Sequence, residues 1–196
     1  MVSPAFQPPT QYVFYAVYAV WVLPEVLSSV RSSTDDGPND DANSIYAVYA
    51  AIGVAVVGGL AFGITSPSWA GLGSYTAPMF WLGCLLMLVG TGVRWYSVSV
   101  LGAAFSRRVE VHRGQDVVEA GPYGVVRHPT YTGSLTTLLG FGLACGTWPS
   151  VLVALLAGLL GYGFRIHVEE RALRETLDGY REYCRRVRYR LVPGIY

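Results

Sequence analysis

The residues best suited to chemistry lie in the segment 120–134, with the sequence AGPYGVVRHPTYTGS. It places an arginine, a histidine and two tyrosines among glycines and prolines. Gly121 and Pro122 predict a turn. Pro129 has a fixed backbone angle and drives His128 toward an extended conformation. We therefore expect a helix to begin at Pro129, with His128 as the last non-helical residue.

The start of such a helix favours an anionic ligand. Its first N–H groups lack partners within the helix, and its dipole is positive there, so it can hold a carboxylate or a phosphate. Arg127 lies beside this position, and Tyr123 and Tyr131 flank it in sequence. Aromatic rings can stack on a flat base or face a cationic centre. These residue types suit a ligand with a planar base, a carboxylate and a positive charge.

A second charged segment, residues 164–187, reads FRIHVEERALRETLDGYREYCRRV and is expected to be one continuous helix. Arg165 and Glu169 are four residues apart and share a face of it. Glu170 falls on the adjacent stripe beside Ile166. Ionisable residues this close to a membrane span are functional candidates. A structural ion pair is the alternative for Arg165 and Glu169, and the later arginines are expected to contact anionic lipid headgroups.

The composition indicates a membrane protein. Hydrophobic residues make up 52% of the 196 residues and charged residues 14%, whereas soluble domains carry about 25% charge. A spanning helix needs about 20 mostly apolar residues. The predicted spans are 12–30, 45–65, 78–101, 133–146 and 149–165. We therefore predict an all-α integral membrane protein with about five transmembrane helices, the last two forming a hairpin, divided into membrane helices 1–103 and a catalytic region 104–196.

The arginines orient these spans. They gather between the third and fourth spans and after the fifth, and the loop 66–77 has none. The positive-inside tendency then places both arginine-rich segments, and the cofactor site that they form, on the cytoplasmic side. Glu25, next to Pro24, weakens the far end of the first span, and Arg94 lies in the last two turns of the third. The acidic segment 32–43 reads as a solvated loop.

Several other functions are disfavoured. His112, His128 and His167 lack metal-ligand spacing, so no metal is expected. The net charge of +1 gives no case for nucleic-acid binding. No glycine pattern follows a strand as a dinucleotide fingerprint would. Gly59 and Gly63 fit close helix packing instead.

The motifs GPYGVVRHPTYTG, EERAL and YREYCRRV, with an apolar hairpin after the first, resemble the isoprenylcysteine carboxyl methyltransferase family. This family belongs with the membrane phospholipid methyltransferases, and the resemblance covers about residues 109–193. It implies an integral membrane enzyme that uses S-adenosylmethionine. Arg165 matches an arginine that binds the substrate carboxylate, and Arg165 and Glu169 are the implied catalytic residues. The implied cofactor-binding residues are Gln115, Asp116, Val117, Val118, Tyr123, His128, Pro129, Thr130, Tyr131 and Glu169.

Four positions depart from the family pattern. Gln115 stands where relatives usually have histidine, Thr176-Leu177 replaces Phe-Gly, and Arg188 replaces a proline. These departures leave the acceptor open. A carboxylate acceptor would be held by Arg165 and needs no general base. An amine acceptor must lose a proton, for which Glu169 or Glu170 would be the candidate.

The ligand inferred from the residues agrees with S-adenosylmethionine, which has an adenine, a carboxylate and a sulfonium. Its methyl group is already activated, so the enzyme mainly aligns two reactants. We predict methyl transfer to a lipid-linked or small hydrophobic acceptor, with the carboxylate of a prenylated cysteine favoured and a phospholipid amine as the alternative. There are two other hypotheses. One is an NADPH-dependent membrane reductase, because sterol reductases share the GPY–RHP–Y region. The other is a non-enzymatic scaffold.

Overall fold

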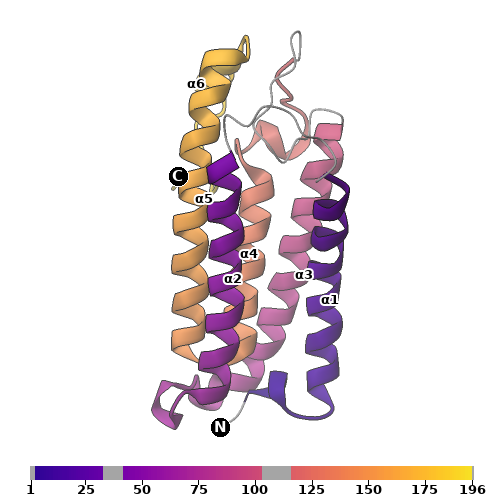
Figure 1. Cartoon of the computed structure of the whole chain (residues 1–196), viewed down its shortest axis with the longest axis vertical. Helices are drawn as coiled ribbons and strands as arrows, with labels where there is room; N and C mark the ends of the chain where they lie inside the picture. The colour runs from indigo at the N-terminus through magenta and orange to yellow at the C-terminus, as the bar shows by residue number, and fades with distance from the viewer. Residues whose placement is uncertain (1–2, 33–41, 103–115, 196) are drawn as a thin grey trace.

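A computed structural model of the chain describes residues 3–32, 42–102 and 116–195. These residues form a helical bundle without a β-sheet, which confirms the predicted all-α fold (Figure 1). The α-helices are α1 Thr10–Ser32, α2 Ala42–Thr65, α3 Thr76–Leu101, α4 Pro129–Cys145, α5 Trp148–Thr176 and α6 Tyr180–Arg186. Short 3-10 segments are η1 Pro4–Phe6, η2 Ser68–Ala70, η3 Gly73–Tyr75 and η5 Gly121–Gly124.

The protein is a multi-pass integral membrane protein. Among the described residues, three segments are long and apolar enough to cross a bilayer: Ser44–Thr65, Gly73–Leu101 and Trp148–Thr176. At most 39% of the apolar window of each is buried inside the protein, so most of their side chains are left to face lipid. α4 has only 17 residues, fewer than the roughly 20 that a span needs, and α1 contains Pro24 and Glu25.

α4 is the central helix of the bundle. It packs along α3 on one side and α5 on the other, and it also touches α2, which pairs with α5. α1 lies at the edge, against α3 and η1 (Figure 1). The start of α4, the end of α5, η5 and α6 all lie at one end of the bundle, opposite the N-terminus. Residues of both charged segments therefore meet at that end.

Glycines bring α3 and α4 unusually close. A Cβ atom added to Gly83 would lie 2.5 Å from the Gly140 carbonyl oxygen, and one added to Gly90 would lie 2.5 Å from the Gly133 carbonyl oxygen. Neither position leaves room for a side chain. This close packing fixes the backbone of α3 against the first turns of α4, where the chemistry-bearing residues begin.

The predicted close packing at Gly59 and Gly63 is confirmed. A Cβ on Gly59 would lie 2.7 Å from the Phe141 ring, and one on Gly63 would lie 2.8 Å from the Phe6 ring. Phe141 is completely buried and, with Phe14 and Trp21 of α1, belongs to the main hydrophobic core. The remaining fully buried apolar side chains of this core include Phe80, Met87 and Leu138.

The predicted hairpin between α4 and α5 is also confirmed. α4 ends at Gly146, whose φ of 80° is left-handed and favours glycine. Thr147 caps α5: its side-chain oxygen accepts a hydrogen bond from the Ser150 N–H at 3.3 Å. Pro149 occupies the first turn of α5, where its missing N–H costs nothing.

The prediction of one continuous helix over residues 164–187 is wrong. α5 ends at Thr176, and α6 begins at Tyr180 after a turn. Gly179 has a φ of 80°, which glycine adopts without the steric cost that a Cβ would bring. The break lets α6 fold back, so that Tyr180 and Tyr183 pack with Val117 in a second small core.

Candidate functional site

The segment 120–134 adopts the predicted turn followed by a helix. Gly121 has a φ of 56° and opens η5. His128 has φ −125° and ψ 59°, which is neither helical nor the extended conformation that was expected, and it directly precedes α4, which begins at Pro129 as predicted. The His128 carbonyl accepts hydrogen bonds from the N–H groups of Tyr131 and Thr132, both at 3.1 Å. These two N–H groups are therefore already hydrogen-bonded within the helix start. Fewer N–H groups than expected remain there to bind an anion.

The C-terminal segment after α6 is bound to this turn. The Arg127 N–H donates to the Tyr189 carbonyl and the His128 N–H to the Arg190 carbonyl, both at 2.9 Å. The Thr132 hydroxyl donates to the Leu191 carbonyl at 2.8 Å. The backbone around His128 is thus fixed by residues about 60 positions later in the chain.

Glu170 organises the ion pairs beneath this turn. Its buried carboxylate lies 2.9 Å from Arg127 Nε, at an angle outside hydrogen-bond geometry, and 3.3 Å from His128 Nε2. Arg174 donates to it at 2.9 Å, and Arg190 donates through two nitrogens, each at 3.1 Å. A buried carboxylate is stable only when it is paired in this way. Three helical or loop segments are therefore tied together by one side chain.

Sequence reasoning missed this role of Glu170. From the sequence, Glu170 was a candidate only as the base for an amine acceptor. The signal available was its place four residues after Ile166, on the stripe that carries core residues. A carboxylate on a buried stripe requires cationic partners, but the sequence does not say which arginines supply them.

Arg165 and Glu169 lie together on one face of α5, as predicted. Arg165 Nε is 3.8 Å from Glu169 Oε2 and 3.4 Å from the Tyr131 hydroxyl. That hydroxyl donates to Glu169 Oε2 at 2.5 Å, and Arg165 Nη1 donates to the Ser44 hydroxyl of α2. Arg165 is buried, whereas the Glu169 side chain is 24% exposed. α2, α4 and α5 therefore meet at one polar network.

Aromatic rings surround this network. The His128 ring stacks on Tyr131 with centroids 5.5 Å apart and planes 10° apart. The Tyr162 ring lies 5.2 Å from Tyr131. Because His128 is stacked on Tyr131 and also reaches Glu170, its ring supports the site instead of standing free to meet a ligand.

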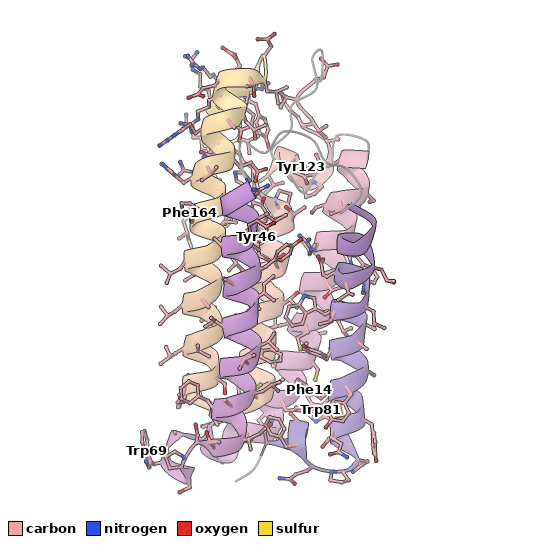
Figure 2. The ribbon with its side chains drawn as sticks, in the orientation of Figure 1. Phe14, Tyr46, Trp69, Trp81, Tyr123 and Phe164 are labelled. Carbon is pink, nitrogen blue, oxygen red and sulfur yellow. The ribbon has the colours of Figure 1, made fainter. Side chains whose placement is uncertain are left out.

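Tyr123 is buried at the other side of the turn and is labelled in Figure 2. Its hydroxyl donates to the Ser97 carbonyl of α3 at 3.3 Å, and its own carbonyl accepts from the Tyr183 hydroxyl at 2.8 Å. Burial raises the pKa of Tyr123 and of Tyr183 well above the ordinary value of a phenol. Both hydroxyls therefore remain protonated donors at neutral pH, and they connect η5 to α3 and α6.

The rest of the predicted cofactor segment lies beside η5. Gln115 falls outside the described residues. Asp116 is exposed, and Val117 and Val118 are half-buried, with Val117 packed against the α6 core. Pro129 and Thr130 are buried in the first turn of α4. Among the residues that the structure describes, no three His, Cys, Asp or Glu side chains group as metal ligands would.

The comparisons with known proteins bear on this site. The sequence model of the family described as phospholipid methyltransferase matches residues 78–178, just over half of the chain. The chain belongs to this family. The matched residues run from the start of α3 to the turn after α5. They include the Arg165–Glu169 network and Glu170, and they confirm the resemblance drawn from the motifs.

This phospholipid methyltransferase family member has curated relatives with different activities. It is 31% identical over 109 residues to protein-S-isoprenylcysteine O-methyltransferase of Saccharomyces cerevisiae, covering 54% of this chain and 46% of that enzyme. It is 36% identical over 87 residues to a Delta(14)-sterol reductase of Mus musculus, covering 42% of this chain and 20% of that protein. The chain thus spans less than half the length of either relative.

A solved structure shares the fold. The eukaryotic intramembrane Ras methyltransferase, isoprenylcysteine carboxyl methyltransferase, superposes with a TM-score of 0.63 over 98% of this chain and 70% of that one. The two sequences are 19% identical. The likeness therefore extends the shared architecture to the N-terminal helices, which the family match does not include.

Proposed function

We propose that the protein is an S-adenosylmethionine-dependent methyltransferase of the membrane, acting on a lipid-linked or small hydrophobic acceptor. The single observation that carries the proposal is the network in which the Tyr131 hydroxyl joins Glu169 and Arg165. It unites a partly exposed carboxylate, a buried cation and an aromatic pair at the end of the bundle where Arg127 and the C-terminal segment lie.

The residues present fit S-adenosylmethionine. Glu169 offers a partly exposed carboxylate to the ammonium of the cofactor, and the rings of Tyr123 and Tyr131 suit a sulfonium. The half-buried Val117 and Val118 provide an apolar edge for the adenine. Gln115 and Asp116 complete the proposed cofactor site, and buried His128, Pro129 and Thr130 support it by fixing the first turn of α4. When bound, S-adenosylmethionine supplies a methyl group that is already activated on sulfur.

The chain's own task is then to align the acceptor. Arg165 is held by Ser44, Tyr131 and Glu169, so the direction of its guanidinium is set before the acceptor binds. A pre-oriented guanidinium can hold a carboxylate through two parallel hydrogen bonds. A carboxylate is already an ionised nucleophile and needs no general base. We therefore favour the carboxylate of a prenylated cysteine as the acceptor.

A phospholipid amine is the alternative acceptor, and it needs a base. Glu170 is poorly suited, because Arg127, Arg174 and Arg190 all stabilise its ionised form. Glu169 is the better candidate, since it is more exposed. The distribution of arginines supports a site on the cytoplasmic side.

The deciding experiment is transfer of a labelled methyl group by the purified protein to total membrane lipid and to a prenylcysteine analogue. We expect the label in the prenylcysteine analogue. Mild alkali should release it as labelled methanol, because alkali hydrolyses a methyl ester but does not remove an N-methyl group. Alkali-stable label in phospholipid would favour the amine acceptor instead. Absence of transfer to either class would count against a methyltransferase.

The identity to a sterol reductase makes an NADPH-dependent reductase the second candidate. Thermal unfolding of the detergent-purified protein separates the two. S-adenosylhomocysteine should raise the unfolding temperature and NADPH should not. Stabilisation by NADPH alone would favour the reductase, and stabilisation by neither would favour a non-enzymatic scaffold.

A further inference from the structure

A second pair of an arginine and a glutamate, both partly buried, lies apart from the site residues above. Arg94 of α3 contacts Glu25 of α1 through two nitrogens: Nε to Oε1 at 2.5 Å and Nη2 to Oε2 at 3.0 Å. The two side chains are 16% and 29% exposed. Ionisable groups within membrane helices are costly and usually functional, so this bidentate pair calls for an explanation.

Arg94 lies next to the proposed acceptor site. A Cβ atom on Gly133, two residues after Tyr131, would be 2.8 Å from the Arg94 backbone nitrogen. The Arg94 guanidinium is close enough to the hydroxyls of Tyr131 and Tyr162 to interact with both electrostatically. The Tyr131 hydroxyl also contacts Arg165. Arg165 therefore contacts Tyr131 directly, and Arg94 of another helix lies within electrostatic range of the same hydroxyl.

The partner of Arg94 sits on the edge helix. The first half of α1 is anchored in the core, where Phe14 and Trp21 pack against Phe141. Beyond Trp21, none of the described α1 side chains belongs to the buried core, and only Val22 packs partly against it. Glu25 follows Pro24, which removes a backbone donor and weakens the helix at that point. Glu25 therefore lies beyond the part of α1 that is anchored in the core, whereas Arg94 is fixed on α3 beside the glycine contacts with α4.

We propose that Arg94 is a docking residue for the acidic head group of the lipid acceptor, and that Glu25 occupies this position until an acceptor arrives. The acceptor carboxylate replaces the Glu25 carboxylate, so the Arg94 guanidinium stays paired with one negative charge. Glu25 is already partly exposed, which lowers the cost of releasing it. The docked carboxylate then lies on the Tyr131 side of Arg94. Arg165, which contacts the Tyr131 hydroxyl, is the cation to which it can pass. That the docked lipid is the methyl acceptor and passes on to Arg165 rests on the proposed function, whereas the binding of an acidic lipid at Arg94 does not.

A purely structural ion pair between α1 and α3 makes opposite predictions. If the pair only locks two helices, neutralising either partner loosens the bundle and weakens any ligand equally. If Arg94 receives the acceptor, neutralising Arg94 weakens binding, but neutralising Glu25 removes an internal competitor and strengthens it. The sign of the Glu25 effect therefore decides between the two.

The test uses the full chain in detergent without cofactor, and N-acetyl-S-farnesylcysteine and its methyl ester as probes. Arg94→Gln should weaken binding of the acid about tenfold or more, and Glu25→Gln should strengthen it several-fold, about 1 kcal/mol or less in free energy. Binding of the uncharged ester should not change in either variant. Arg181→Gln and Glu182→Gln, both exposed in α6, are the matched controls.

A charge swap adds a second measurement. The double variant Glu25→Arg/Arg94→Glu should regain the thermal stability that either reversal alone loses, yet should not bind the acid. In turnover, Arg94→Gln should lower kcat/KM for the acceptor with kcat nearly unchanged and affinity for S-adenosylhomocysteine unaltered. Weaker acid binding in Glu25→Gln, or acid binding by the swapped variant, would overturn the proposal. Absence of methyl transfer with the binding results intact would overturn only the proposed function.

Discussion

The surroundings of Glu169 and Glu170, adjacent residues of α5, differ in number of partners and in exposure. Glu170 faces inward, with its side chain 5% exposed and three arginines and a histidine around it. Glu169 points toward Tyr131 and Arg165, and its side chain is 24% exposed. Successive residues of a helix point about 100° apart, so one step along α5 separates a saturated carboxylate from an accessible one. The first holds the fold together, and the second is positioned to meet a ligand.

The largest effect is expected at Glu170. Glu170→Gln removes the charge that compensates buried Arg127, and loss of one partner of a buried ion pair costs about 3–5 kcal/mol. The temperature of thermal unfolding should therefore fall steeply. Glu175→Gln, exposed on the same helix, is the control and should leave it unchanged. Normal stability of Glu170→Gln would show that the two carboxylates are less different than their surroundings indicate.

Arg165 tests the acceptor side of the Glu169 region. Arg165→Ala should spare the affinity for S-adenosylhomocysteine and lower turnover of a carboxylate acceptor about a hundredfold or more, since a paired buried charge contributes about 2–5 kcal/mol. Arg165→Lys should recover little, because an ammonium lacks the planar fork of a guanidinium. Calorimetry of cofactor binding and the methyl-transfer assay measure the two effects separately. Equal losses in both assays would assign Arg165 to the cofactor instead.

Glu169 tests the cofactor side. Glu169→Ala should weaken S-adenosylhomocysteine binding about ten- to hundredfold. This corresponds to the loss of one hydrogen bond to a charged group, which contributes about 1.5–3 kcal/mol. Its thermal stability should fall less than that of Glu170→Gln, because the Glu169 carboxylate is partly hydrated and Arg165 keeps its contacts with Ser44 and Tyr131. Tyr131→Phe, which keeps the ring that stacks on His128, should show a smaller loss of affinity. Unchanged affinity in both variants would refute the assignment of the cofactor site.

A third carboxylate, Glu119, gives the smallest expected effect. It is exposed and pairs with exposed Arg186, whose hydrogen bond lowers the pKa of the Glu119 carboxyl. A depressed pKa in the folded state contributes stability at neutral pH that is lost as the pH falls through that pKa. Solvent screens exposed ion pairs strongly. The unfolding temperature of Glu119→Gln at pH 7 should therefore equal that of the unsubstituted chain within error. A clear difference at pH 7 would mean that this pair fixes the segment before η5.

The sequence by itself determined the features that depend on neighbouring residues. The apolar runs predicted five long helices, of which three are long and apolar enough to cross a bilayer. Pro129 set the start of α4, and the four-residue spacing brought Arg165 and Glu169 to one face. Local backbone geometry and helical periodicity suffice for these results. The helix break at Gly179 was also signalled locally by the Asp-Gly pair, although one continuous helix was predicted there.

Only the tertiary structure decided which distant groups meet. Glu170 and Arg127 are 43 positions apart, and Arg94 and Glu25 are 69 apart. Any of the 14 arginines could satisfy a buried carboxylate on charge alone. The choice depends on how α4 packs between α3 and α5 and on where the C-terminal segment returns. Those contacts arise from the close approach at Gly90 and Gly133 and from backbone bonds to Tyr189 and Arg190, which no local pattern encodes.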